Sequence, residues 1–167
     1  MRTLIKNAYI YSSHKEDFIK GNLLFANKKI VSVNEENAHE AENVIEANGA
    51  LVIPGFVDIH THGRSGYDFC CADTDSLSTM KKSYLECGTT SLMPTLASAP
   101  LNVLTSAMDA INKSKADDSV GAHFLGIHLE GRYLNAEKRG AHSSELLSEL
   151  NSDEISSLIY ALKSIHF

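Results

Sequence analysis

The sequence lacks the features that mark several other protein classes. Its 167 residues include no tryptophan, and the formal net charge of -6 comes without any block of basic residues. A mildly acidic chain of this kind is a poor partner for nucleic acid or for an anionic membrane. No apolar run approaches the roughly 18 residues needed to cross a bilayer. The composition, 43% hydrophobic and 22% charged, is that of an ordinary soluble domain. We therefore expect neither a nucleic-acid nor a membrane partner.

Cysteine is scarce, and its spacing excludes the common cysteine-based sites. Cys70, Cys71 and Cys87 make an odd number, adjacent cysteines rarely pair, and no CxxC spacing occurs. Residues 1–11 contain no long apolar segment of the kind found in signal peptides. Reduced thiols in a cytoplasmic protein are therefore expected. A Walker loop, a GxGxxG after a strand and a GxSxG elbow are also missing, and with them the usual signatures of nucleotide binding and serine hydrolysis.

The first third of the chain has the pattern of short strands. Apolar residues alternate or cluster in residues 3–11 and 21–36, between turn signals at 27–29 and 48–49. This pattern predicts a small β-sheet without catalytic residues. From Leu51 the run LVIPGFVDIH (51–60) is almost continuously apolar. Such a run is typical of a strand buried on both faces of a parallel sheet.

Strands and helices then alternate along the chain. Apolar residues at helical spacing predict a helix over 75–88, with Asp75 or Ser76 as its N-cap and Gly88 at its end. The further expected elements are helices at 100–115 and 152–165 and strands at 89–95 and 121–130. This alternation predicts a parallel sheet with right-handed crossovers, in either a doubly wound fold or a (β/α)8 barrel. Three βα units fall short of a barrel, which runs to about 250 residues when complete.

Two histidines end the apolar run. His60 and His62 are two residues apart, so on a strand both side chains lie on one face. They also lie at the C-terminal end of the strand, where parallel α/β folds build their sites. Imidazole nitrogen is a good ligand for zinc and neighbouring divalent metals. Taken alone, the pair also fits a simpler interpretation, with one hydrogen-bonded core histidine and one that faces solvent.

A carboxylate favours the metal-site interpretation. Glu130 ends the strand expected at 121–130 and is followed by glycine, so it is placed to point towards His60 and His62 from another strand. His128, two residues earlier, is placed to share that face with Glu130; the alternative, which we favour, is an outer partner of the site or a core histidine. Asp58 either orients a histidine ligand through a hydrogen bond or caps a local turn.

The loop at 135–144 gathers positive charge in an otherwise acidic chain. Lys138, Arg139 and His142 surround Gly140. Beside a metal site these side chains would recognise phosphate or sugar hydroxyls. The alternative is an ordinary solvated loop.

Three segments together closely resemble the N-acetylglucosamine-6-phosphate deacetylases of the amidohydrolase superfamily. They are PGFVDIHTHGRSGYDF (54–69), ECGTTSLMPTLAS (86–98) and LGIHLEGRYLNAEKRGAH (125–142), in the family's order and spacing. The first segment alone indicates only the superfamily, whereas the GTT strand, and HLEG followed by GAH, point to the deacetylases. The resemblance covers essentially the whole chain but about the first two-fifths of a family member.

The resemblance implies an α/β fold, namely the N-terminal part of a metal-dependent (β/α)8 TIM barrel preceded by strands of a small β-sandwich domain. Residues 1–53 would be the N-terminal β-sandwich portion, and residues 54–167 the first three βα units of an incomplete amidohydrolase barrel. The implied reaction is hydrolysis of the acetamide of N-acetylglucosamine 6-phosphate, an amino-sugar phosphate, to glucosamine 6-phosphate and acetate. The implied cofactor is divalent metal, zinc or iron, as one or two ions. Complete family members imply a homo-oligomer.

The resemblance also implies roles for individual residues. Glu130 matches a metal ligand of the family. His60 and His62 match the HxH ligands of members that hold a second metal. Ala141 and His142 match a substrate-binding position.

The chain departs from the family in two respects. Arg132 stands where the family usually has proline after HLEG. The family's two further histidine ligands and its catalytic aspartate, the general base, come from later strands, and His166 comes too early to replace them. We therefore expect these 167 residues by themselves to be an incomplete and inactive fragment. The alternatives are a non-catalytic truncated product, half of a split enzyme, or another amidohydrolase such as a dihydroorotase-like cyclic amidase. Glu130 and the GAH loop argue against the last of these.

Overall fold

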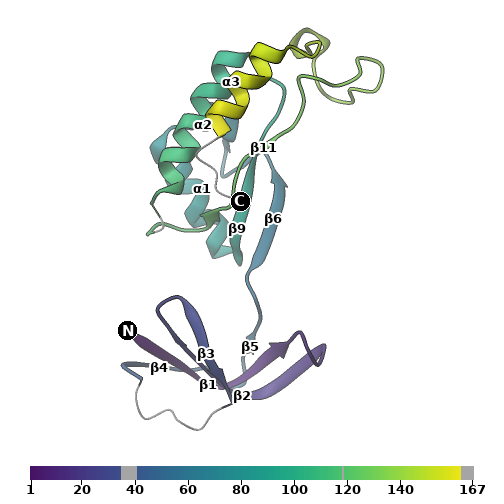
Figure 1. Ribbon diagram of the computed structural model, residues 1–167. Helices are drawn as coiled ribbons and strands as arrows, with labels where there is room; N and C mark the ends of the chain where they lie inside the picture. Colours follow the sequence, from purple (N-terminus) through teal and green to yellow (C-terminus); the bar gives the residue numbers. More distant parts are fainter. Residues whose placement is uncertain (35–40, 118, 163–167) are drawn as a thin grey trace. The chain divides into compact units, whose positions relative to one another are not determined.

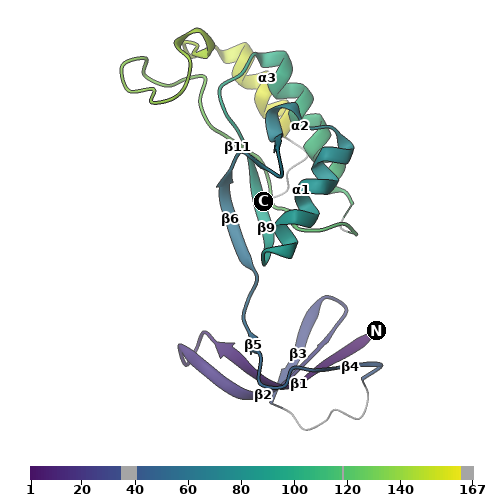
Figure 2. The ribbon, with the colours of Figure 1, turned by 180° about the vertical axis from the view of Figure 1, so that it is seen from behind.

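The computed structural model describes residues 1–34, 41–117 and 119–162. The chain divides into two compact units, Met1–Pro54 and Gly55–Phe167, both drawn in Figures 1 and 2. The division falls inside the apolar run 51–60, so the prediction of one continuous strand there is wrong. Strand β5 (Leu51–Val52) belongs to the sheet of the first unit and β6 (Phe56–Thr61) to that of the second. The break lies at Pro54, which has no N–H to donate to a continuous ladder.

The first unit is a five-stranded sheet. Its strands are β1 (Arg2–Ser12), β2 (Asp17–Ala26), β3 (Lys29–Val33), β4 (Asn43–Glu46) and β5. β1, β2 and β3 form an antiparallel meander, while β4 and β5 run parallel to β1. Residues 27–28 and 48–49 have positive φ, so both turns predicted from the sequence are present. Ala8, Ile10 and Leu23 form the buried core of the sheet, and none of the predicted site residues lies in this unit.

The second unit is built on parallel strands. β6 pairs along one edge of β9 (Thr89–Leu96), and the opposite edge of β9 pairs first with β10 (His123–Phe124) and then with β11 (His128–Leu129). All these pairings are parallel, as the alternation of elements predicted. The strand expected at 121–130 is split into two short pieces, however. Gly126 lies between them, and glycine in a strand interior weakens pairing because it has no side chain to pack.

Short elements connect the first strand to the first helix. After β6 the chain forms a small hairpin of β7 (Gly63–Arg64) and β8 (Tyr67–Asp68), then a 3-10 turn, η2 (Phe69–Cys71). Phe69 is fully buried there. A second 3-10 turn, η3 (Ser144–Leu146), interrupts the long loop before the last helix.

Three helices follow the strands. These are α1 (Thr74–Glu86), α2 (Leu101–Lys115) and α3 (Ser152–Leu162). In both views they lie together next to β9 and away from β6 (Figures 1 and 2). Leu77, Met80 and Tyr84 of α1 pack into the main core, as their helical spacing predicted. The expected positions 163–165 of the third helix, and His166, lie outside the described residues. Among the described helices, none combines the length and the apolar character needed to span a bilayer.

The cap of α1 differs from the prediction. Asp73, rather than Asp75 or Ser76, is the N-cap. Its carboxylate accepts a hydrogen bond from the Ser76 N–H at 2.8 Å, and its own N–H donates to the Ser76 hydroxyl at 2.8 Å. This reciprocal pair satisfies two otherwise free backbone donors. Ser76 is therefore the third helical residue, and the true cap lies three positions before it.

β6 is not buried on both faces, contrary to the sequence prediction. Phe56, Val57 and Ile59 are 59%, 58% and 65% exposed. In the part of the chain that the structure describes, β6 pairs with β9 alone, and the helices lie on the β9 side (Figure 1). An apolar run indicates that a strand is suited to burial, but the strand is buried only where neighbouring elements cover it.

Candidate metal centre

Two histidines lie close together at the C-terminal end of β6. His60 lies on β6, and His62 follows the strand's last residue. Their side chains share a face, as the i, i+2 spacing predicted, and their ring centroids are 5.2 Å apart. Each ring keeps nearly half of its side-chain surface exposed, 48% for His60 and 44% for His62. Neither histidine is therefore the buried core residue of the simpler interpretation.

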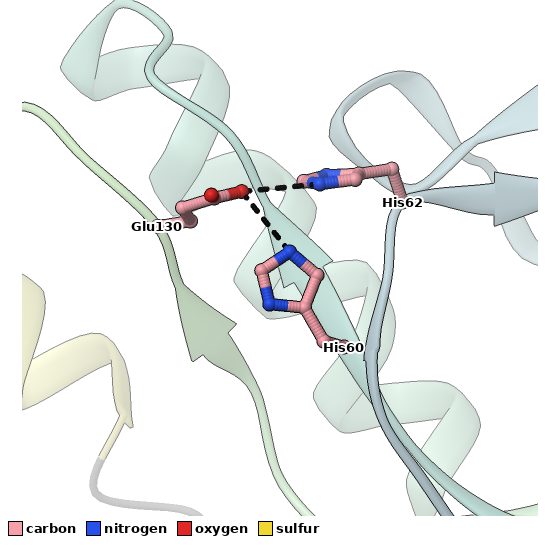
Figure 3. Close-up of side chains that lie close together, drawn as sticks. All are labelled: His60, His62 and Glu130. Atoms are coloured by element: carbon pink, nitrogen blue, oxygen red, sulfur yellow. Dashed lines mark ion pairs between the residues drawn. The ribbon is translucent and has the colours of Figure 1, made fainter. Parts of the chain in front are cut away.

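Glu130 completes the cluster from another strand. It follows β11, and its N–H donates to the Leu96 carbonyl oxygen at 2.8 Å, which ties it to the end of β9. Its Oε2 lies 3.4 Å from His60 Nε2 and 3.1 Å from His62 Nε2. Figure 3 shows Glu130 pointing towards the two histidines from the opposite side, with His60 and His62 on one continuous segment. The ligand atoms all lie within 4.8 Å of one another.

The chemistry of these donors fits a divalent cation. Two imidazole nitrogens and one carboxylate oxygen are a ligand set that zinc and neighbouring divalent metals accept. All three groups come from the ends of parallel strands, the usual position of a site in α/β folds. Catalytic metal sites use three protein ligands and keep a further position for water or substrate. The cluster therefore has the donor types and the number of donors of such a site.

His128 and Asp58 take up more local positions. The His128 ring lies 4.8 Å from the His60 ring, edge to face. His128 therefore packs beside His60. Asp58 Oδ1 accepts a hydrogen bond from the His60 backbone N–H at 3.1 Å. The Asp58 carboxylate thus contacts the backbone of His60 within β6.

A cavity of about 550 Å³ opens beside the cluster. Its walls include His62, Glu130, Arg139, Ala141 and His142. His142 Nε2 lies 3.7 Å from Glu130 Oε1, so the loop at 135–144 does reach the cluster. Arg139 gives the cavity a cationic wall, and its Nε is buried without a hydrogen-bond partner among the described residues. Lys138, by contrast, is exposed on the loop.

Tyr84 was assigned no functional role from the sequence, yet it holds the His62 segment. Its hydroxyl hydrogen-bonds with the Thr61 hydroxyl and donates to the Gly63 carbonyl oxygen at 3.0 Å. The two residues that flank His62 are thus tied to α1. Burial raises the pKa of the Tyr84 hydroxyl, so it remains a proton donor at neutral pH. The sequence showed Tyr84 only as part of the apolar face of a helix, and its hydroxyl contacts had no sequence signal.

The contacts of Arg132 account for the absence of the family's usual proline at this position. Its φ is +66°, and its N–H donates to Ser98 Oγ at 2.9 Å. Proline can provide neither, because its ring fixes φ near -65° and it has no N–H. The guanidinium forms a fork with the Glu154 carboxylate at 2.6 and 3.0 Å, which ties the loop after Glu130 to α3. Hydrogen bonding from Arg132 lowers the pKa of Glu154.

The cysteines lie outside the cluster. All three thiols are free. Burial, with the nearby Asp68 carboxylate, raises the pKa of Cys70 to about 11. A thiol with this pKa is neutral at physiological pH and is a poor nucleophile or metal ligand. The structure thus agrees with the absence of any cysteine pattern for catalysis.

In sequence, the chain is similar to part of several sugar-phosphate deacetylases. No family model matches it. It is 32% identical over 129 residues to N-acetylglucosamine-6-phosphate deacetylase of Vibrio furnissii, a match that covers 77% of this chain and 32% of the relative. It is 33% identical over 117 residues to N-acetylgalactosamine-6-phosphate deacetylase of Escherichia coli O157:H7, covering 70% of this chain and 31% of the relative. The chain thus spans about a third of the length of the curated relatives it matches.

Solved structures of such a deacetylase also match almost the whole chain. The crystal structure of N-acetylglucosamine-6-phosphate deacetylase from Pasteurella multocida matches 99% of this chain and 43% of its own, with a TM-score of 0.86 and 27% identity. A D-hydantoinase structure matches 82% of this chain with a TM-score of 0.54 and 22% identity. The second likeness shows only that the mixed α/β fold is shared.

Proposed function

Since this chain is homologous to about a third of an N-acetylglucosamine-6-phosphate deacetylase, we propose that it carries part of the active site for hydrolysis of an N-acetylated amino-sugar phosphate. The products would be the free amino-sugar phosphate and acetate. The observation that carries the proposal is the convergence of His60, His62 and Glu130 within 4.8 Å beside a cavity. The 32% identity to the Vibrio furnissii enzyme supports the choice of reaction.

Each residue has a role that its chemistry supports. His60, His62 and Glu130 would hold one or two divalent ions, with zinc and iron as the candidates. A bound ion would polarise the acetamide carbonyl and lower the pKa of a water molecule. Ala141 and His142, on the cavity wall, would contact the sugar. Arg139 would add positive charge for an anionic substrate.

The two units have proposed places in a larger fold. We propose that Met1–Pro54 is the N-terminal portion of a small β-sandwich and that Gly55–Phe167 forms the first βα units of a (β/α)8 barrel. The parallel pairing of β6 and β9 supports the barrel. The exposed apolar side chains of β6 support it as well, because helices cover the outer face of the strands in such a barrel. A polypeptide of these 167 residues would then bind metal without turning over substrate, as half of a split enzyme or as a non-catalytic product.

The sugar itself has two candidates. The E. coli relative named for N-acetylgalactosamine 6-phosphate is 33% identical to this chain, as close as the relatives named for N-acetylglucosamine 6-phosphate. The two sugars differ in the orientation of one hydroxyl. We propose the glucosamine substrate as the main candidate because the relatives named for it are more numerous, and the galactosamine substrate as the second.

Two further features of the proposal concern the cell. The three free thiols support a cytoplasmic location. A homo-oligomer is proposed from the family resemblance.

A chimera would test the function directly. The chain would replace the matching segment of the Vibrio furnissii enzyme, and acetate release would be measured with each sugar phosphate. We expect turnover of N-acetylglucosamine 6-phosphate, loss of turnover in Glu130→Gln, and no turnover by the 167-residue chain alone. A folded, metal-loaded chimera without activity on either sugar would contradict the proposal. Turnover by the chain alone that Glu130→Gln abolishes would contradict its incompleteness.

A further inference from the structure

We propose that Ser98 is a positioning residue that fixes the tautomer of His142, so that His142 presents an Nε2–H to the cavity beside Glu130. Ser98 follows β9; it ends the segment 86–98 that resembles the family, but the sequence assigned it no role. The inference deepens the proposed function at one point, because it assigns the proton that His142 offers to a bound oxygen atom. Its evidence is the set of hydrogen bonds around one hydroxyl group.

The Ser98 hydroxyl has two partners with different requirements. Its Oγ lies 2.9 Å from the Arg132 backbone nitrogen and 2.9 Å from His142 Nδ1. A backbone N–H can only donate, so Arg132 occupies one lone pair of Oγ. A serine hydroxyl also carries one proton to donate. With Arg132 as donor, His142 Nδ1 is the neighbouring atom that can accept that proton among the described residues.

The other end of the imidazole selects the same tautomer. His142 Nε2 lies 3.7 Å from Glu130 Oε1. An ionised carboxylate can only accept hydrogen bonds, so a lone pair on Nε2 would face a negative oxygen, whereas an Nε2–H is attracted to it. The tautomer of a neutral histidine is set by the hydrogen bond that its other nitrogen makes. Ser98 at Nδ1 and Glu130 at Nε2 therefore act together.

The packing shows that this contact is built into the fold. A Cβ at Gly131 would come within 2.0 Å of Ser98 Oγ and 3.2 Å of the His142 ring. Gly131 also has a φ of +109°, which other residues rarely adopt. The Ser98–His142 pair thus fits against bare backbone next to Glu130. The His142 side chain is only 14% exposed, which limits competition from water for its Nδ1.

This arrangement makes His142 a hydrogen-bond donor to whatever occupies the cavity. An Nε2–H suits a carbonyl, hydroxyl or phosphate oxygen, all of which accept hydrogen bonds. It does not suit a role as proton acceptor at Nε2. Ser98 acts only through His142 and is not itself a catalytic residue.

The test uses nitrogen NMR of the full 167-residue chain labelled with ¹⁵N-histidine and freed of metal by a chelator. The spectra are recorded at mildly alkaline pH, where free imidazole is neutral. His142→Gln identifies the His142 signals by their disappearance. We expect a protonated Nε2 and an unprotonated Nδ1 in the wild-type chain. In Ser98→Ala the two nitrogen shifts should move towards each other as tautomers exchange, and Ser98→Thr should restore the wild-type pattern.

Several outcomes would overturn the inference. They are a protonated Nδ1 in the wild-type chain, unchanged His142 shifts in Ser98→Ala, or a Ser98→Thr pattern like that of Ser98→Ala. Circular dichroism checks that each variant keeps its helices. If Ser98→Ala does not fold, the wild-type and Ser98→Thr spectra still decide, because both retain a hydroxyl. No substrate or metal is present, so failure here is distinct from failure of the chimera assay.

Discussion

Glu130 is the residue on which the candidate metal centre depends most. Its Oε2 faces both His60 and His62 at 3.4 and 3.1 Å, so it is the contact that the two histidines share. We predict that Glu130→Gln, which keeps the shape and removes the charge, lowers the affinity of the chain for Zn²⁺ by more than about 100-fold. This is beyond the roughly 10- to 100-fold effect of losing an outer partner of a metal site. Isothermal titration calorimetry measures the affinity.

A matched control is available on α1. Glu86 is exposed at the end of that helix, and Glu86→Gln makes the same change in net charge away from the cluster. It should bind Zn²⁺ as the wild-type chain does. Equal loss in both variants would mean that only net charge matters, and unchanged binding by Glu130→Gln would exclude it as a ligand.

At the scale of elements, α1 positions the strand end that carries His62. The Tyr84 hydroxyl contacts Thr61 and Gly63 on either side of that histidine. We predict that Tyr84→Phe lowers Zn²⁺ affinity by about 10- to 100-fold, the range typical of residues that orient ligands. The free energy of unfolding should fall by only about 1 kcal/mol, because one hydrogen-bonding hydroxyl is lost.

Tyr67→Phe is the matched control for Tyr84→Phe. It removes the same hydroxyl from a side chain that is 48% exposed on β8. Calorimetry with Zn²⁺ should show no change for this variant. A Tyr84→Phe chain that binds Zn²⁺ like Tyr67→Phe would refute the positioning role of α1.

The loop after Glu130 is tied to α3 by a charged cluster whose strength depends on pH. Hydrogen bonding from Arg132, and then from Tyr133, lowers the pKa of Glu154 below its unfolded value. The stabilisation is therefore present above the unfolded pKa of about 4.3 and is lost as the pH falls through the lower folded value. We predict that Glu154→Gln lowers the free energy of unfolding by about 1 to 3 kcal/mol at neutral pH, and that this difference shrinks in acid.

Urea unfolding, followed by the circular dichroism of the helices, measures the difference in free energy of unfolding between wild type and Glu154→Gln at neutral and at acid pH. The α-helices in the described part of the chain, α1, α2 and α3, lie in the second unit, so the signal reports on it. Glu149→Gln, at an exposed position in the preceding loop, should follow the wild-type chain throughout. A difference between wild type and Glu154→Gln that stays constant down to about pH 3, below the usual carboxyl range, would show that the carboxylate charge does not matter.

The sequence predicted elements better than the contacts between them. Periodicity located α1, α2 and α3 because apolar spacing follows directly from helix geometry. It missed the Asp73 cap because several polar residues in a row all satisfy the composition of a cap. The sequence also predicted that the side chains of His60, His62 and Glu130 lie close together. It gave no sign of Ser98 or Tyr84, since a hydroxyl's partners depend on tertiary packing.

At the scale of the whole molecule, the site lies entirely within the second unit. His60 and Glu130 are far apart in sequence, and the parallel pairing of β6 and β11 with β9 brings them together. The first unit has its own small core. The same second unit carries a strand, β6, whose apolar side chains are largely exposed. Exposed apolar strands of this kind mark surfaces that another element covers.

Substitutions on β6 would test whether a completed barrel covers that strand. Val57 and Ile59 are two residues apart on β6, so their side chains lie on the same face of the strand. They are 58% and 65% exposed. In the 167-residue chain, the double variant Val57→Thr, Ile59→Thr should change the free energy of unfolding by less than about 0.5 kcal/mol per site, as exposed substitutions usually do. It should also bind less of a hydrophobic dye.

In the chimera with the Vibrio furnissii enzyme, the same double variant should lower the free energy of unfolding by about 2 kcal/mol for each side chain that becomes buried. Leu92→Thr, at a fully buried position on β9, should destabilise both proteins. Equal, small effects of the double variant in both backgrounds would mean that this face of β6 stays uncovered, and the barrel proposal would then fail.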